Sequence, residues 1–236
     1  MSKVIAIIPA RWGSTRLPGK PILDINGKPM IQRVYESVKK SNVDEILVAT
    51  DDERIFDCVK KFNGNVLMTS PKHETGTDRV LEAYEMFKDI YEYVINVQGD
   101  EPMINPNDIN SIINRLNEDK WKIATLLGSL TNQQRTDRNT VKAFIDLNKI
   151  VMFTRSPLYG NPTFFKRHIG VYGFSKAVAK NIDKTIMIET TNEIVENLEQ
   201  LRWADNGIGF SYSITNGLYK GIDTQKDLDH YRSFLN

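Results

Sequence analysis

The sequence predicts an α/β protein with a mixed, mostly parallel sheet flanked by helices and a small inserted lobe. Helical patterns separate four apolar, β-branched runs, which lie at Val4–Ile8, Glu45–Thr50, Asn65–Met68 and Tyr93–Val97. Such alternation is typical of a parallel sheet. The second half is less regular, so we expect a single domain over residues 1–236 with the lobe inserted at roughly 129–190.

The helices of the first half are predicted from apolar residues at helical spacing and from their capping residues. Pro29 suits the first turn of a helix over Met30–Lys40, and a second helix is expected over Glu53–Phe62. Asn105 is predicted to cap a helix that begins at Pro106. Each of these helices connects two strands of the predicted sheet.

The second half combines strands with one long helix. The predicted strands are Ile123–Leu130, Val141–Asp146, Ile150–Thr154, Ile169–Phe174 and Phe210–Ile214. A helix is expected over roughly Thr191–Asp205 and is expected to end at Gly207, a residue suited to the left-handed cap conformation. The apolar face that this helix should bury consists of Ile194, Leu198 and Leu201.

Composition and charge exclude several classes of protein. Hydrophobic residues make up 40% and charged residues 26% of the chain, as in an ordered globular protein. Lysine and arginine (31) almost balance aspartate and glutamate (30), so the chain has no basic excess for binding nucleic acid. Cys58, the single cysteine, can form no internal disulfide and suits a reducing compartment. No apolar run reaches the length of a membrane span, and we expect a cytoplasmic protein without membrane or nucleic-acid partners.

The loop after the first strand carries the strongest functional signal. It reads Pro9-Ala10-Arg11-Trp12-Gly13-Ser14-Thr15-Arg16-Leu17-Pro18-Gly19-Lys20-Pro21 and contains three cations, two glycines and two hydroxyls. After a central strand, such a loop lies where ligands bind in an open α/β sheet. Glycines admit phosphate close to backbone N–H groups, and Arg and Lys supply positive charge. The loop follows neither the Walker pattern nor Gly-x-Gly-x-x-Gly, and its alternative interpretation is a solvated basic loop.

A carboxylate is expected at the same edge of the sheet. The motif Val97-Gln98-Gly99-Asp100-Glu101-Pro102 follows an apolar strand, which makes Asp100 a candidate Mg²⁺ ligand. Mg²⁺ is usually bound by one or two carboxylates together with phosphate oxygens and water. Asp223 is the second candidate, because it lies on the loop before the last helix, whose capping box is Thr224–Asp227. Alternatively, Asp223 only marks the start of that helix.

Other polar segments have functions that spacing does not fix. The segment Glu74–Arg79 joins a strand to a helix and could contact a base or ribose, although Thr77 could instead cap that helix and Asp78 complement its dipole. His73 beside it is expected on the surface. The segments Arg167–Tyr172 and Leu198–Arg202 could contact a polar substrate. Spacing alone would make Glu199 and Arg202 of the second segment a surface ion pair, worth about 0.2–0.5 kcal/mol.

Five motifs together resemble one enzyme family. They are I-P-A-R-W-G-S-T-R-L-P-G-K-P, E-T-G-T-D-R, V-Q-G-D-E-P, R-H-I-G-V-Y-G and L-E-Q-L-R, and the resemblance runs from Ile5 to about Leu228. The family is that of the bacterial 3-deoxy-manno-octulosonate cytidylyltransferases, also called CMP-Kdo synthetases. The resemblance implies a Rossmann-like fold of the nucleotide-diphospho-sugar transferase type. It implies transfer of CMP from CTP to the acid sugar Kdo, with release of pyrophosphate, by a cytoplasmic Mg²⁺-dependent homodimer that serves lipopolysaccharide biosynthesis.

The resemblance also assigns roles to individual residues. It implies that the nucleotide is bound by Ala10, Arg11, Gly13, Ser14, Lys20, Thr77, Asp78 and Arg79. The implied catalytic residues are Arg11, Lys20 and the two Mg²⁺ ligands, Asp100 and Asp223. The residues implied to bind the eight-carbon acid sugar are Gln98, Arg155, His168, Tyr172, Glu199 and Gln200.

The chain departs from the family's pattern at several positions. Trp12 stands where tyrosine is usual, and the segment Leu158–Phe165 is shorter than in most members. Thr190–Asn192 replaces Ser-Pro-Leu, and Asn197 replaces an apolar residue. The last three departures leave the acceptor open between Kdo and a relative such as 8-amino-Kdo.

Three other functions are weighed against this one. A cytidylyltransferase for a sialic-acid-like nonulosonate would share the fold, but the Leu198–Arg202 helix argues against it. A nucleotidyltransferase for sugar 1-phosphates would need basic residues for the second phosphate. A non-catalytic nucleotide-binding regulator is disfavoured because both Asp100 and Asp223 are present.

Overall fold

The computed structural model describes residues 2–13, 17–160, 163–185, 189–217, 219 and 221–234. Ser14, predicted to bind the triphosphate, lies outside the described residues. The chain forms two compact units, one made of Met1–Asn110 and Leu218–Asn236 and the other of Ser111–Gly217. The lobe expected at 129–190 falls inside the second unit, which also includes strands on either side of it.

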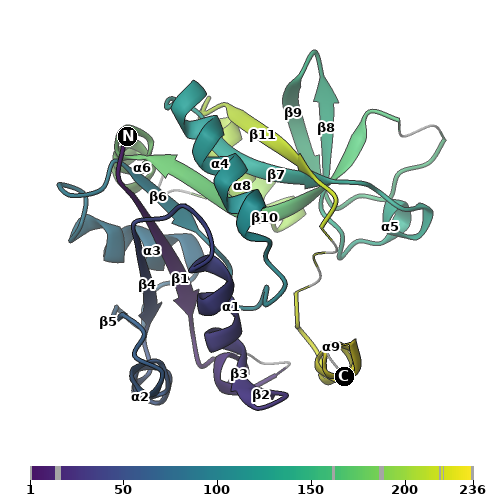
Figure 1. Cartoon of the computed structure of the whole chain (residues 1–236). Coiled ribbons are helices and arrows are strands. Elements are labelled where there is room, and N and C mark those ends of the chain that lie inside the picture. Colours follow the sequence, from purple (N-terminus) through teal and green to yellow (C-terminus); the bar gives the residue numbers. More distant parts are fainter. Residues whose placement is uncertain are drawn as a thin grey trace. The chain divides into compact units, whose positions relative to one another are not determined.

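The first unit contains the predicted parallel sheet (Figure 1). Its strand order is β6 (Tyr93–Asn96), β1 (Val4–Ala10), β4 (Glu45–Thr50) and β5 (Val66–Met68). All three pairings are parallel. Residues 4 to 8 of β1 are at most 2% exposed, because a central parallel strand is covered on both faces. The carboxyl ends of the four strands therefore meet at one edge.

A helix follows each of these strands, as the sequence predicts. They are α1 (Met30–Val38), α2 (Glu53–Lys61), α3 (Gly76–Glu85) and α4 (Pro106–Glu118). The Asn105 carboxamide oxygen accepts a hydrogen bond from the backbone N–H of Asn107 at 2.9 Å, which confirms the predicted cap of α4. After β1, the chain forms the 3-10 helix η1 (Lys20–Ile22) and a two-stranded hairpin, β2 (Asp24–Ile25) and β3 (Lys28–Pro29), neither of which was predicted.

The C-terminal helix α9 (Gln225–Phe234) lies beside the β2–β3 hairpin (Figure 1). The Arg232 side chain donates from Nη2 to the carbonyl oxygen of Asp24 at 2.6 Å, beside β2. A small core joins α9 and the preceding loop to β2, to α1 and to the loop Arg11–Lys20, which we call the phosphate loop. The core consists of Leu17, Ile25, Met30, Ile222, Leu228 and Tyr231. This core places the loop before α9 beside the end of the Arg11–Lys20 loop.

The second unit has its own mixed set of strands. Strand β10 (Phe165–Ser175) pairs antiparallel with β7 (Ile123–Gly128) and with β8 (Lys142–Asp146). Strand β11 (Phe210–Thr215) runs parallel to β7, and β9 (Lys149–Thr154) pairs antiparallel with β8. Two helices, α5 (Asn132–Thr136) and α6 (Lys176–Thr185), were not predicted. Within the part of the chain that the structure describes, β9 has no strand partner other than β8.

The predicted long helix over Thr191–Asp205 is wrong, because the chain forms two helices there. These are α7 (Thr191–Glu196) and α8 (Glu199–Asp205). Asn197 ends α7 with φ 52° and ψ 54°, a left-handed conformation that asparagine tolerates better than most residues. Leu198 and Leu201 are buried as expected, but Ile194 is 62% exposed because the break ends the common apolar face.

Together these elements confirm the predicted fold class, a mixed and mostly parallel sheet with flanking helices. Among the described helices, none combines the length and apolar character needed to cross a membrane.

Candidate active site

Three predicted residues meet at the carboxyl edge of the first unit's sheet. The Lys20 ammonium group donates to Asp100 Oδ2 at 2.6 Å and to Asp223 Oδ1 at 3.1 Å. Lys20 comes from η1, Asp100 from the loop after β6 and Asp223 from the loop before α9. The Lys20 side chain is 14% exposed, whereas those of the aspartates are 30% and 45% exposed. The two carboxylates are thus held together by a cation and remain open to a ligand.

Backbone contacts fix the loop that carries Asp223. The Ile222 N–H donates to the carbonyl oxygen of Asp100 at 3.1 Å. A Cβ atom at Gly221 would lie 3.5 Å from Glu101 Oε1 and 3.9 Å from the Asp100 side chain, so the two loops lie in ordinary van der Waals contact. Thr224 and Asp227 form the predicted capping box, in which Thr224 Oγ1 accepts from the Asp227 N–H at 3.2 Å.

Burial and charge act in opposite directions on Lys20. Burial of the ammonium group lowers its pKa, but attraction and hydrogen bonding to Asp100, and then to Asp223, outweigh burial and raise the pKa of Lys20 above 10.5. Lys20 therefore carries a positive charge at neutral pH. It is a fixed cation beside two carboxylates, as a polyphosphate site requires.

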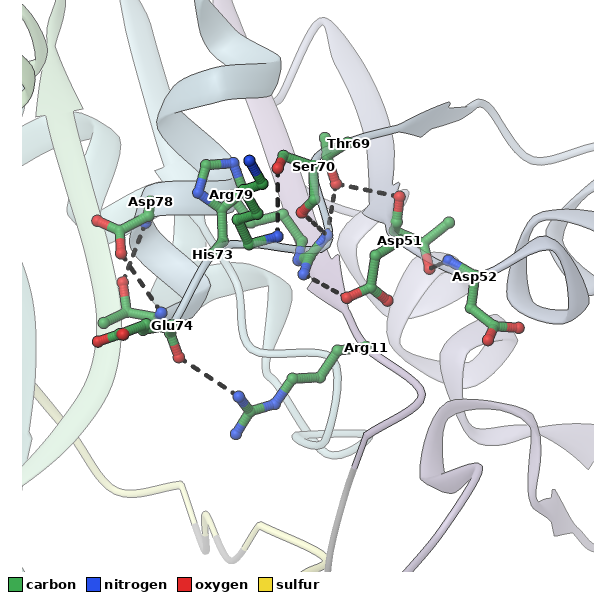
Figure 2. Close-up of polar contacts among 12 residues, drawn as sticks. Arg11, Asp51, Asp52, Thr69, Ser70, His73, Glu74, Asp78 and Arg79 are labelled. Atoms are coloured by element: carbon green, nitrogen blue, oxygen red, sulfur yellow. Dashed lines mark hydrogen bonds and ion pairs between the residues drawn. The ribbon is translucent and has the colours of Figure 1, made fainter.

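Arg11 lies at the start of the phosphate loop, whereas Lys20 lies at its end. Arg11 contacts the segment after β5 (Figure 2). Its Nη1 donates to the carbonyl oxygen of Glu74 at 3.3 Å. That is a weak anchor, so the guanidinium remains available to an anionic ligand. Figure 2 shows Arg11 pointing toward Glu74 from the end of β1, at the sheet edge where the predicted nucleotide site lies.

Arg79 is placed differently from the expectation (Figure 2). Its side chain is 2% exposed, and its guanidinium donates to Asp51 Oδ2 at 2.7 Å, to Thr69 Oγ1 at 2.5 Å and to the Ser70 carbonyl oxygen at 3.4 Å. These three bonds tie α3 to the ends of β4 and β5. The expected contact of this side chain with the nucleotide stays a prediction, which its 2% exposure disfavours.

The remaining residues of the predicted nucleotide segment are also engaged within the protein. Thr75, rather than Thr77, is the N-cap of α3, and Asp78 completes its capping box. Thr77 is 1% exposed, and its Oγ1 accepts from the buried Asn96 Nδ2 at 3.0 Å. The Asn96 oxygen in turn accepts from Gln98 Nε2 at 3.3 Å. This chain of hydrogen bonds joins the start of α3 to the end of β6.

An aromatic contact closes the phosphate loop on itself. The Cα of Gly19 packs so closely on Trp12 that an added Cβ would lie 2.9 Å from Trp12 Cη2, and Gly19 also has φ +65°. On the Trp12 ring lies the Arg54 guanidinium, 3.3 Å from the centroid. Asp52 holds Arg54 with hydrogen bonds of 2.8 and 2.7 Å. Sequence reasoning missed Arg54, because no pattern links it to a loop about 40 residues earlier.

The predicted sugar residues of the second unit gather around a bulge in β10. The register of β10 shifts between Ile169 and Tyr172. The His168 and Tyr172 ring centroids lie 5.5 Å apart, whereas four residues span about 13 Å along a straight strand. Tyr172 Oη donates to Gln200 Oε1 of α8 at 3.2 Å, and both side chains are buried.

His168 is a neutral imidazole. Burial, and then the charge of Arg155, lower the pKa of His168 from 6.5 to about 3. Its Nε2 lies 3.0 Å from Thr125 Oγ1, which donates its own proton to the Val171 carbonyl oxygen at 2.9 Å. Nε2 is then the donor, and Nδ1 is left as an acceptor. His168 can therefore accept a hydrogen bond from a hydroxyl group but cannot supply positive charge.

Arg155 supplies the positive charge of this second cluster. Its guanidinium donates only to backbone carbonyl oxygens among the described residues, those of Asn139 at 3.2 Å, Arg138 at 3.4 Å and Asn197 at 3.4 Å. Burial lowers its pKa more than the nearby Glu196 charge raises it, yet the pKa of an arginine lies so high that it stays charged. A guanidinium with long bonds to carbonyl oxygens suits a carboxylate ligand.

Arg202 is not the surface residue that spacing alone suggests. Its Nε and Nη2 each donate to the Glu193 carboxylate at 2.7 Å, and both side chains are buried. This bidentate pair joins α7 to α8 across the break at Asn197. Glu199, the first residue of α8, lies one residue before the buried Gln200.

The structure therefore forms two clusters from the predicted residues. In the first unit, Lys20, Asp100 and Asp223 bring one cation and two carboxylates together at the carboxyl edge of the sheet, where Arg11 follows β1 and Gln98 follows β6. In the second unit, Arg155, His168, Tyr172 and Gln200 provide one cation and several neutral polar groups for an acidic polar ligand. Asp51, which directly follows β4 and pairs with the buried Arg79 at 2.7 Å, was not identified from the sequence.

Comparisons with known proteins agree with this chemistry. A family model described as cytidylyltransferase matches residues 5–213. A 3-deoxy-manno-octulosonate cytidylyltransferase of Parabacteroides distasonis is 41% identical, with 100% of this chain and 99% of that protein covered. One from Fusobacterium nucleatum is 42% identical, with 99% and 97% covered. A solved structure of CMP:2-keto-3-deoxy-manno-octonic acid synthetase complexed with CTP is 37% identical, with a TM-score of 0.92 and 99% and 98% covered.

Proposed function

This chain belongs to the cytidylyltransferase family, and from that premise we propose that it transfers CMP from CTP to the anomeric hydroxyl of 3-deoxy-D-manno-octulosonate (Kdo). It is a CTP-dependent sugar nucleotidyltransferase. The reaction releases pyrophosphate and forms CMP-Kdo, the activated sugar for bacterial surface polysaccharides such as lipopolysaccharide. Relatives named 3-deoxy-manno-octulosonate cytidylyltransferase match the chain at about 40% identity over nearly its whole length.

The observation that carries this proposal is the contact of Lys20 with both Asp100 and Asp223. These residues come from three distant segments of the first unit, and their oxygens lie 2.6 and 3.1 Å from one ammonium nitrogen. An ordinary surface ion pair joins two exposed side chains, whereas here three segments of the chain converge on one ammonium group. Two carboxylates and a half-buried lysine at the carboxyl edge of a sheet instead fit a triphosphate with its metal.

The donor set fits Mg²⁺ as the cofactor. Asp100 and Asp223 provide hard carboxylate oxygens, which already face a common cation in Lys20 Nζ. Within the described residues no cluster of three or more His, Cys, Asp or Glu side chains is suited to a metal. Mg²⁺ commonly takes only one or two carboxylates and completes its shell with phosphate oxygens and water. When bound, it would supply neutralisation of the triphosphate charge.

The chain's own residues would act by position and charge. The anomeric oxygen of the acid sugar attacks the α-phosphorus of CTP, the bond from that phosphorus to the bridging oxygen breaks, pyrophosphate leaves, and the hydroxyl proton passes to solvent. Lys20 and Arg11 would hold the triphosphate and the negative charge that develops on pyrophosphate. No covalent bond to the protein is required, because transfer of this kind depends on alignment and electrostatic stabilisation.

The second unit would bind the acceptor. Arg155 would pair with the sugar carboxylate, since its guanidinium contacts only carbonyl oxygens among the described residues. His168 and Gln200 would bind sugar hydroxyls. The two departures from the family at Thr190 and Asn197 lie at the two ends of α7, which is joined to α8 and hence to Gln200. A related acid sugar such as 8-amino-Kdo is therefore the second candidate acceptor.

The test is pyrophosphate release with CTP and Mg²⁺ in the presence of Kdo, 8-amino-Kdo or a sialic acid. We expect release with Kdo, and release with 8-amino-Kdo at a rate that reports on the altered α7 ends. Faster release with 8-amino-Kdo than with Kdo would replace the acceptor but keep the reaction. No release with any of the three sugars would overturn the proposed function.

We also propose that the enzyme is a homodimer located in the cytoplasm. Support for the dimer comes from the second unit, where the edge strand β9 exposes Val151 and Met152 by 58% and 43%, and Ile214 on β11 is 56% exposed. An exposed apolar edge strand is a template for pairing with another chain. The cytoplasmic location rests on the substrate, because CTP is made and used inside the cell.

A further inference from the structure

Among the described residues, Lys142 is the one lysine that is fully buried. It lies on β8 and is 0% exposed. A charged ammonium group is removed from water at a cost that only close partners offset. Its Nζ donates to the carbonyl oxygen of Asp137 at 2.7 Å and to the carbonyl oxygen of Arg155 at 2.9 Å. The proposed reaction gives this lysine no role.

The second of those acceptors belongs to the residue that we assign to the sugar carboxylate. Lys142 pairs in register with Thr154 on β9, so the residue that follows Thr154 lies next to the lysine. The Arg155 carbonyl oxygen is held by Lys142, and the Arg155 N–H donates to Glu196 Oε2 at 2.7 Å. Both peptide groups that flank the Arg155 Cα are therefore fixed by charged side chains.

Glu196 reinforces the same point of the backbone. Its Oε1 accepts from Thr154 Oγ1 at 2.8 Å and from Ser156 Oγ at 3.3 Å. Three consecutive residues are thus bound to one carboxylate at the end of α7. Hydrogen bonds to charged groups are roughly twice as strong as neutral ones, so this frame is stiffer than an ordinary loop after a strand.

The guanidinium that the frame carries is held much less tightly. Its bonds to the carbonyl oxygens of Arg138, Asn139 and Asn197 measure 3.2 to 3.4 Å. The backbone of Arg155 is therefore fixed, while its charged end keeps only long contacts that a carboxylate ligand would replace. Such an arrangement is expected where a binding group must be aimed before the ligand arrives.

We propose that Lys142, together with Glu196, is a positioning residue that fixes the backbone of Arg155 so that its guanidinium meets the carboxylate of the acid sugar. This inference rests on the proposed function, because it takes Arg155 as the sugar-binding cation. Neither Lys142 nor Glu196 contacts the sugar. A displacement of about 1 Å at a positioning group can cost a hundredfold in rate, so the effect on the acceptor is expected to be large.

The experiment compares Lys142→Met with a matched control, Lys122→Met. Methionine keeps the length and apolar body of lysine but donates no hydrogen bond. Lys122 lies in the same unit, on the surface, and pairs with Asp119 at 2.7 Å. We expect Lys142→Met to raise the KM for Kdo at least tenfold, with the dissociation constant for CTP unchanged, because the CTP residues lie in the other unit. The control should change neither.

A second variant covers the case in which Lys142→Met does not fold. Glu196→Gln keeps one acceptor for the Arg155 N–H but loses the charge, and we expect the same selective rise in the KM for Kdo. Amide hydrogen exchange at residues 154–156 should also be faster in both folded variants than in the wild type, whichever sugar is accepted.

The outcomes separate the two proposals. A wild-type KM for Kdo in a folded Lys142 or Glu196 variant would overturn the positioning role, as would an equal loss of CTP and Kdo binding. Wild-type enzyme that is inactive with every acid sugar would instead overturn the proposed function. In that event unchanged amide exchange at residues 154–156 would overturn the frame as well.

Discussion

The Asp100 carboxylate accepts a hydrogen bond from Lys20 at 2.6 Å and is also a proposed ligand of Mg²⁺. Replacing it with asparagine keeps the shape but removes the charge that both cations require. We expect Asp100→Asn to lower kcat by about two to three orders of magnitude, the size typical of lost electrostatic stabilisation at a reacting phosphate or acyl group. Pyrophosphate release at saturating CTP and Mg²⁺ measures this.

The fold should survive that substitution, because the Asp100 side chain is 30% exposed and Lys20 keeps Asp223 as a partner. Circular dichroism and the melting temperature provide the check. Asp146→Asn, at an exposed position on β8, is the matched control and should leave kcat unchanged. Near-normal turnover of Asp100→Asn would remove Asp100 from the metal site.

His168 predicts a specific response of stability to acid. Its pKa is about 3 in the folded chain and 6.5 as a free side chain, because burial, and then Arg155, disfavour the charged form. As pH falls, the His168 imidazole therefore takes up a proton in the unfolded chain before it does so in the folded chain. The contribution of neutral His168 to the free energy of unfolding is full above pH 6.5 and is lost as pH falls toward 3. From this residue alone we expect the free energy of unfolding to fall by up to about 1.4 kcal/mol per pH unit.

Urea unfolding between about pH 5 and pH 6.5 isolates the histidine, because most carboxylates titrate below that range. In His168→Gln the free energy of unfolding should change less steeply with pH than in the wild type. His230→Gln, at an exposed position, should keep the wild-type dependence on pH. Equal slopes in the two variants would show that His168 is not the group that titrates.

At the residue scale, sequence reasoning found the charged groups but not their direction. Lys20, Asp100 and Asp223 follow strands or precede a helix, and their positions in the topology are enough to bring them to one edge. Arg79 lies in an equally suggestive motif, yet its guanidinium turns inward to Asp51. The orientation of a long side chain depends on acceptors from other segments, which the motif itself does not contain.

Helix α9 is the element that delivers Asp223 to the active site. Leu228 of α9 is 1% exposed and packs in the core that also contains Ile222, next to Asp223. We expect Leu228→Ala to lower the free energy of unfolding by about 2–5 kcal/mol, as for other buried leucines. It should also raise the Mg²⁺ concentration needed for half-maximal rate, because the loop before α9 loses its anchor.

The matched control is Leu116→Ala in α4, where the leucine is 0% exposed and lies in the other unit. It should cost comparable stability but leave the Mg²⁺ dependence unchanged. Urea unfolding and rates measured against Mg²⁺ concentration separate the two effects. If both variants shift the Mg²⁺ dependence equally, loss of stability alone would explain the change.

At the element scale, periodicity predicted the four parallel strands of the first unit, and the helices α1 and α2, to within one or two residues, since central parallel strands are continuously apolar. It did not predict η1 or the hairpin of β2 and β3. Periodicity failed where the backbone changes direction within a pattern. The break at Asn197 interrupts a row of apolar residues whose helical spacing is otherwise regular. The N-cap of α3 is Thr75 rather than Thr77, because the helix begins two residues earlier than the sequence suggested.

At the scale of the whole molecule, the chain brings together residues that are far apart in sequence. Lys20 and Asp223 are separated by 203 positions and meet because a small core joins the two ends of the chain in one unit. Sequence could place both residues on loops but could not supply that core, which consists of six apolar residues from five segments. The sequence likewise does not reveal that β9 ends as an edge strand, which depends on pairing across the second unit.

That edge strand leads to the prediction about assembly. Val151 on β9 is 58% exposed, and β9 has β8 as its one strand partner in the described chain. We expect light scattering to give twice the 27.0 kDa of a single chain, and Val151→Lys to shift the mass toward one chain, because a lysine buried without a partner opposes association. Met86→Lys, an exposed position in the other unit, is the control and should leave the mass unchanged. A wild-type mass of one chain at micromolar concentration would refute the dimer, and an unchanged mass for Val151→Lys would place the interface elsewhere.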